Sequence, residues 1–186
     1  MSKKIRWITE TAAMLALLIS LQWVGSMIPT PMVKQLVTGS CVNAVLAVTA
    51  LCVGLSGGCV VALISPWVAY FLGIAPQVLT VPAIMLGNVV YVALMYFVAG
   101  KNSKNIFRQT AAWIVAAAAK FAALYVMVVW LICDVFAPRL MDAGMLKMPM
   151  LKALPATFSW PQLITALIGG AVALVITPIL RKALHK

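Results

Sequence analysis

Charged residues are scarce in this chain of 186 residues. They make up 9% of the sequence, whereas a soluble domain carries about 25%. Hydrophobic residues make up 65%, and the mean hydropathy is +1.09. This composition excludes a soluble globular domain and also excludes intrinsic disorder. Because a membrane span needs about 20 apolar residues, we predict an all-α integral membrane protein.

Acidic residues and histidine are rarer still. The only carboxylates are Glu10, Asp134 and Asp142, and the single histidine, His185, lies in a basic tail. Enzymatic sites in membranes generally need clustered Asp, Glu, His or Arg, often with a metal. We therefore expect no enzyme, no metal site and no cofactor. The phosphate loop G-x-x-x-x-G-K-[ST] is also absent, so ATP-driven transport would require ATPases on other chains.

The four cysteines do not indicate a disulfide framework. Cys41, Cys52, Cys59 and Cys133 form no C-x-x-C pair and lie in apolar stretches, where small buried hydrophobic side chains are the expected role. A disulfide between Cys41 and Cys133 stays open at this point.

Apolar runs separated by proline and glycine predict six transmembrane helices in a single membrane domain, 1–186. Their approximate ranges are 7–24, 36–55, 59–72, 82–99, 110–133 and 159–180. We expect a tight turn at Ser56-Gly57-Gly58 and a kink at Pro66 in the third helix. Residues 134–158 form the longest segment predicted not to span. Because it holds Pro138, Pro149 and Pro155, we expect a long loop on the outer side.

Basic residues concentrate on one side of this six-helix arrangement. Nine lie with the two termini: Lys3, Lys4, Arg6, Lys101, Lys104, Arg108, Arg181, Lys182 and Lys186. Four lie on the other side: Lys34, Arg139, Lys147 and Lys152. The positive-inside rule then places both termini in the cytoplasm. The net charge of +11 is thus interpreted as a topology signal of a multi-pass membrane protein, and we expect no nucleic-acid partner.

Polar residues gather toward the outer ends of the predicted helices. Thr38, Ser40 and Asn43 begin the second helix, and Gln162 and Thr165 begin the last. Their grouping, with Asn88 and Tyr91 near mid-depth, favours a polar cavity that opens outward. The alternative is a set of interhelical hydrogen bonds, which are common in membrane proteins.

Lys120 lies near the middle of the fifth predicted helix. A lysine at this depth costs about 2.5–3.5 kcal/mol, and no acidic residue is predicted at the same level. Two roles remain open: an anchor for an anionic ligand, or a cap for backbone carbonyls freed near Pro66. With aromatic and amide side chains nearby, the anchor suits a small aromatic or heterocyclic compound with an anionic group.

Small residues recur on the first helix at Ala12, Ala16 and Ser20. Such a stripe allows another helix to approach closely. The neighbouring helix belongs either to a partner subunit or to this chain.

Six helices in under 200 residues, both termini inside, no ATPase motif and the Ala12-x-x-x-Ala16 spacing together resemble the substrate-binding S components of energy-coupling factor (ECF) transporters. The resemblance implies capture of a vitamin or related micronutrient in an outward-facing pocket. It implies a transmembrane T component that contacts Ala12 and Ala16, and two separate ATPase subunits. The rival reading is a stand-alone secondary transporter or channel for a small organic solute, but such coupling usually needs intramembrane carboxylates.

Carried over to this chain, the resemblance places the site on the last three helices, with Lys34 and Gln77 in the loops that cover it. Together with Asn43 from the polar grouping, the expected substrate-binding residues are Lys120, Asn88, Tyr91, Gln162, Trp160, Thr165, Asn43 and Gln77.

Overall fold

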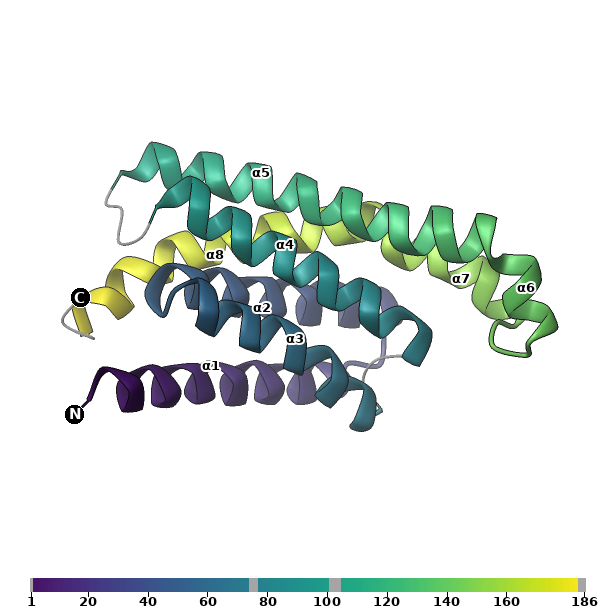
Figure 1. The fold of residues 1–186 in the computed structure, drawn as a ribbon, viewed down its shortest axis with the longest axis horizontal. Helices are drawn as coiled ribbons and strands as arrows, with labels where there is room; N and C mark the ends of the chain where they lie inside the picture. Colours follow the sequence, from purple (N-terminus) through teal and green to yellow (C-terminus); the bar gives the residue numbers. More distant parts are fainter. Residues whose placement is uncertain (1, 74–76, 101–104, 184–186) are drawn as a thin grey trace.

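The computed structural model describes residues 2–73, 77–100 and 105–183, which form helices joined by short connections (Figure 1). The described part contains no strand. The α-helices are α1 (Lys3–Ser26), α2 (Pro31–Cys52), α3 (Leu55–Phe71), α4 (Val81–Ala99), α5 (Ile106–Leu124), α6 (Ala137–Asp142), α7 (Met148–Phe158) and α8 (Trp160–Ala183). A 3₁₀ turn, η1 (Val78–Thr80), precedes α4, and a π-helical segment, η2 (Tyr125–Val135), continues α5.

The prediction of an all-α membrane protein is confirmed. In the described part, five helical segments are long and apolar enough to cross a membrane. The third predicted span corresponds to α3, a shorter apolar helix of 17 residues. At about 1.5 Å of rise per residue, α3 lies at the lower limit of the length that spans a bilayer.

The boundary between the second and third helices differs from the prediction. α2 begins at Pro31 rather than near residue 36, because proline is favoured in the first turn of a helix. It ends at Cys52, and the chain turns at Gly54, whose φ of 113° suits glycine. The turn predicted at Ser56-Gly57-Gly58 is therefore wrong, since these residues already belong to α3.

The segment predicted as a long outer loop is largely helical. η2 extends α5 outward, α6 turns the chain, and α7 returns to run into α8 as one long rod (Figure 1). Pro138 and Pro149, which suggested a loop, lie in the first turns of α6 and α7, where a missing N–H costs no hydrogen bond. A second hydrophobic core, which includes Val128, Cys133 and Leu154, joins η2 to α7.

α2 lies at the centre of the bundle, in contact with α1, α3, α4 and α8. Its approach to α8 is so close that a Cβ at Gly169 would lie 2.5 Å from the backbone oxygen of Ser40. The small-residue faces of these two helices are buried against each other, as glycine and alanine permit. Their buried residues include Asn43, Ala47, Ala50, Thr165, Ala166 and Ala173.

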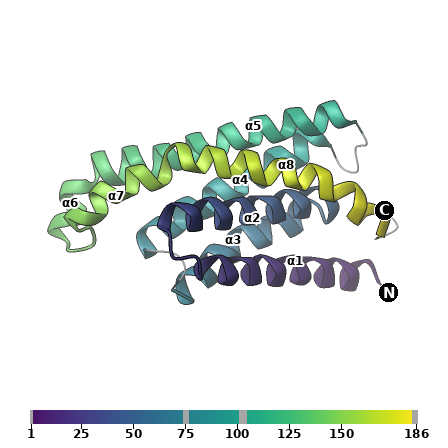
Figure 2. The same ribbon diagram turned by 180° about the vertical axis from the view of Figure 1, so that it is seen from behind.

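The two ends of the chain lie at the same end of the bundle (Figures 1 and 2). At this end Arg181 Nη2 donates a hydrogen bond of 2.8 Å to the carbonyl of Leu51, and Trp7 Nε1 donates one of 3.1 Å to Ser56 Oγ. α6 lies at the opposite end (Figure 1). The predicted loop residues Lys101 and Lys104, and Lys186 in the tail, lie outside the described residues.

We expect the terminal end to face the cytoplasm, because nine of the basic residues are assigned to it and four to the other end. The cysteines are all free thiols, so they can be replaced without breaking a disulfide. In that background Lys147→Cys should react with a membrane-impermeant maleimide in intact cells, whereas Lys182→Cys should react only after the cells are permeabilised. Labelling of both sites in intact cells would contradict this topology.

Candidate functional site

A cavity of about 400 Å³ lies in the half of the bundle farther from the termini, because its wall includes residues of α7 and of the first turns of α2 and α8. Residues of α1, α2, α3, α4, α5, α7 and α8 line it, and the first four turns of α2 contribute the most lining residues. Its volume falls in the range of pockets for small molecules, about 300–1,000 Å³. Leu124 and Phe158 belong both to its wall and to the second hydrophobic core, so the outer helical segment closes this end of the cavity.

Lys120 is the most buried charged residue of the cavity wall, with 3% of its surface exposed. Its Nζ donates hydrogen bonds to Asn43 Oδ1 at 2.5 Å and to Asn88 Oδ1 at 2.7 Å. The same nitrogen lies 5.5 Å from the ring centroid of Tyr91, within reach of a cation–π interaction. An ammonium group has three N–H donors, and the third has no acceptor among the described residues.

A chain of hydrogen bonds fixes the orientation of this centre. Asn43 Nδ2 donates to Thr165 Oγ1 at 3.3 Å, and Thr165 Oγ1 donates to the carbonyl of Gln162 at 3.0 Å. With its amide nitrogen engaged on α8, Asn43 presents its oxygen to Lys120. The Tyr91 hydroxyl donates to the carbonyl of Ala166 at 3.4 Å. The ammonium group is therefore held by α2 and α4, each of which is also bonded to α8.

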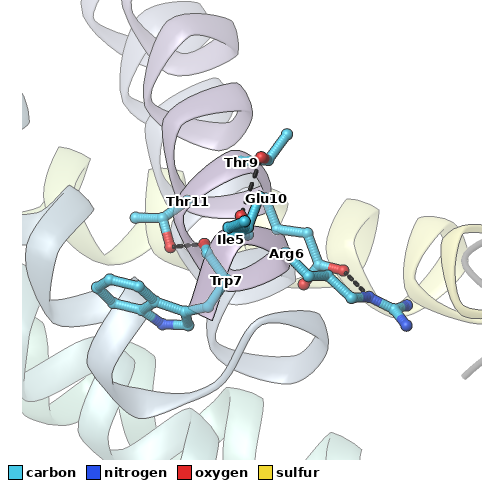
Figure 3. Close-up of polar contacts among 6 residues, drawn as sticks. All are labelled: Ile5, Arg6, Trp7, Thr9, Glu10 and Thr11. Atoms are coloured by element: carbon cyan, nitrogen blue, oxygen red, sulfur yellow. Dashed lines mark hydrogen bonds and ion pairs between the residues drawn. The ribbon is translucent and has the colours of Figure 1, made fainter. Parts of the chain in front are cut away.

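No carboxylate balances this charge. The described residues that line the cavity include Lys34 and Lys120 but no Asp or Glu. Glu10 lies near the N-terminus of α1 and pairs with Arg6 at 2.8 Å (Figure 3). Asp134 and Asp142 are exposed on the outer segment. Among the described residues, two amide oxygens and one aromatic face compensate the buried ammonium group.

Lys120 makes none of its hydrogen bonds with the backbone near Pro66. Both go to side-chain amides, while Ser65 and Pro66 line another part of the same cavity wall. The helix α3 continues through Pro66 to Phe71.

The residues expected to bind substrate divide into three groups. Lys120, Asn43, Asn88 and Gln162 line the cavity. Tyr91 and Thr165 are buried and do not form part of the wall. Tyr91 contacts Lys120, and Thr165 contacts Asn43.

Trp160 and Gln77 do not lie in the cavity wall. Half of the Trp160 surface is exposed at the start of α8. Lys34, expected in a loop over the site, does line the cavity, but from the first turn of α2.

Four polar residues of the wall were missed by the sequence analysis: Gln22, Gln35, Ser65 and Thr157. Thr38 was part of the polar grouping that favoured a cavity but was not among the expected substrate-binding residues. Gln22 is the only amide in the apolar run of α1, which is a signal that the sequence offers. Gln35 Nε2 donates to the carbonyl of Thr157 at 2.6 Å and so ties α2 to α7. Nothing local in the sequence indicates that contact, since the residues are far apart along the chain.

The small-residue stripe of α1 faces away from the bundle. Ala12, Ala16 and Ser20 are exposed, whereas Thr11, Leu18 and Gln22 on the other face are buried. A stripe that packed inside this chain would be covered, so its exposure leaves it accessible to lipid or to another subunit.

Comparison of the chain with protein families, curated proteins and solved structures gives one match. The searches of curated proteins and of solved structures found none. The family model described as "ECF transporter, substrate-specific component" matches residues 10–181, which is nearly the whole chain and includes every helix that lines the cavity. The chain therefore belongs to the family of substrate-specific components of ECF transporters.

Proposed function

We propose that this chain captures a vitamin or related micronutrient that carries an anionic group, and that the cavity around Lys120 is where it binds. Family membership implies substrate capture within an ECF transporter. The observation that supports the site is a buried ammonium group with one unused donor, in a small-molecule-sized cavity whose described wall has no carboxylate.

Electrostatics favour an anion at this position. Attraction between unit charges strengthens as the effective dielectric falls, and Lys120 is almost wholly buried. The opposing term is the desolvation of both ions, so the net gain depends on further hydrogen bonds to the anion. In the same wall, Asn88 has amide N–H donors. Gln162 Nε2 donates to the carbonyl of Thr157 at 3.2 Å and has a second N–H for such a bond.

The rest of the wall suits an apolar body rather than a second charge. Pro66, Ile84 and Phe158 line the cavity from α3, α4 and α7. An aromatic or heterocyclic ring would pack against these side chains and gain from leaving water. A polycationic compound is disfavoured, because the two lysines of the described wall would repel it.

Transport requires partners that this chain does not contain. We propose a transmembrane T component that packs on the exposed face of α1 at Ala12 and Ala16, together with two ATPase subunits, in a bacterial cell membrane. The exposed stripe supports this arrangement, since small residues allow close approach of another helix.

Lys120→Met should abolish high-affinity binding while the protein still folds, because methionine keeps much of the apolar length and removes the charge. Removing one partner of a buried ion pair costs about 3–5 kcal/mol, which is a hundredfold or more in affinity. The compound retained by the detergent-purified protein is released and quantified by mass spectrometry per mole of protein. Lys152→Met, on the exposed outer segment, is the matched control. Equal retention by wild type and Lys120→Met would show that Lys120 is structural.

Ala16→Trp should block assembly with the T component and ATPases, and with it uptake, while leaving retention of the compound unchanged. A large side chain prevents close helix approach, and Ala16 is exposed, away from the cavity. The matched control is Ala118→Trp, an exposed alanine on α5, on the opposite side of the bundle from α1. Copurification of the transporter subunits gives the result. Normal assembly of the Ala16→Trp variant would show that the stripe is not the surface that contacts the T component.

A further inference from the structure

We propose that the cavity contains a second, neutral subsite, formed by Gln22, Thr38 and Ser65, which binds a hydroxyl, amide or ring N–H of the substrate remote from its anionic group. This inference rests on the proposed function, since it concerns the same cavity. It narrows the substrate to a compound with an anionic group, an apolar middle and an uncharged hydrogen-bonding group at a distance from the anion.

The first observation is that these three residues carry buried polar atoms without partners. Gln22 Oε1, Thr38 Oγ1 and Ser65 Oγ accept and donate no hydrogen bond among the described residues. Gln22 is 8% exposed and Ser65 is 1% exposed, and all three residues line the cavity. A buried polar atom without a partner is unfavourable, so a ligand group that bonds to it gains affinity.

Two of these side chains could have been satisfied locally, and they are not. Hydroxyl groups in helices commonly bond to the carbonyl four residues earlier. Thr11 and Thr49, both buried in this bundle, do so at 2.8 Å and 2.6 Å. Thr38 and Ser65 make no such bond, so both hydroxyls keep a hydrogen-bonding capacity that no described residue uses.

The three residues lie on helices that meet at one side of the cavity. Thr38 Oγ1 lies against Gly25 of α1, and Gln22 precedes Gly25 by about one turn on the same buried face. Gln22 and Thr38 are therefore neighbours where α1 contacts α2. Ser65 comes from α3, which packs on both of these helices.

On α2, the neutral subsite and the Lys120 centre use different residues. Thr38 belongs to the former, and Asn43, which binds Lys120, belongs to the latter. Five residues of α-helix rise by about 7.5 Å. Apolar atoms of Val42, Pro66 and Ile84 contribute to the same wall. The rise from Thr38 to Asn43 gives the separation expected between the anionic group and a neutral substrate group that bonds to Thr38.

Two small acids of matched length test the neutral subsite. Hexanoate and 6-hydroxyhexanoate share a carboxylate and an apolar chain, and they differ only by a hydroxyl at the far end. Their dissociation constants are measured by ligand-observed NMR titration of the dialysed full-length chain in nanodiscs. We expect the wild type to bind 6-hydroxyhexanoate about threefold to tenfold more tightly, the effect of one hydrogen bond to a buried group.

Variants of the subsite should remove this preference. Gln22→Leu, Thr38→Val and Ser65→Ala should each reduce this preference, the ratio of the two dissociation constants, by about threefold or more. The matched controls are Ser40→Ala and Thr177→Val. Both change a buried hydroxyl that has no partner but lies outside this cavity, and both should keep the full preference.

The outcomes separate this inference from the proposed function. Equal wild-type affinity for the two acids, or a preference that survives all three subsite variants, overturns the neutral subsite. Lys120→Met should weaken the binding of both acids by the same factor, so that the preference for 6-hydroxyhexanoate stays the same. If Lys120→Met changes neither affinity, the anionic site is overturned instead, and binding of neither acid to the wild type overturns both.

Discussion

The hydrogen bonds from the Lys120 ammonium group to Asn43 and Asn88 determine how the outer half of this bundle is arranged. A lysine this deeply buried needs compensation, and here it comes from amide oxygens at 2.5 Å and 2.7 Å. Because the amides belong to α2 and α4, the bonds draw three helices together at one depth. The cavity forms on the outer side of that point, and its floor is the polar centre itself.

The use of amides rather than carboxylates has a chemical consequence. An aspartate at either position would neutralise the lysine within the protein and leave little attraction for an external anion. Asparagine orients and partly stabilises the ammonium group without cancelling its charge. Glu10 is engaged with Arg6 at the other end of α1. The cavity therefore keeps a positive charge that a substrate anion can neutralise.

α1 connects this cavity to the surface where we place the partner subunit. Its buried face contributes Gln22 to the cavity wall, and its outward face carries Ala12 and Ala16. A ligand that bonds to Gln22 would therefore contact the same helix that a T component would contact. The rod of α7 and α8 instead closes the cavity from the outer side, through Phe158 and Gln162.

The polar centre around Lys120 could be predicted from the sequence, but other polar residues of the cavity wall could not. Lys120 is an outlier in an apolar run, and Asn43 and Asn88 are amides near its expected depth, so the centre was foreseeable. Gln22 and Ser65 were missed because one polar residue in a helix does not reveal which face is buried.

The helices of the outer segment were missed for another reason. Pro138 and Pro149 suggested a loop but lie in first turns, where proline is tolerated. Trp160 was expected at the site and lies outside the cavity, because its direction depends on how α7 continues into α8.

The most direct test of the account is the affinity of Asn88→Asp for hexanoate. This change keeps the size and shape of the side chain, and its oxygen can still accept from Lys120, but it supplies an internal counter-ion. The conservative change Asn105→Asp, at the exposed N-cap of α5, is the control. The account predicts that Asn88→Asp folds and binds hexanoate at least about tenfold more weakly than wild type. Unchanged affinity would contradict the claim that an unneutralised Lys120 holds the anion.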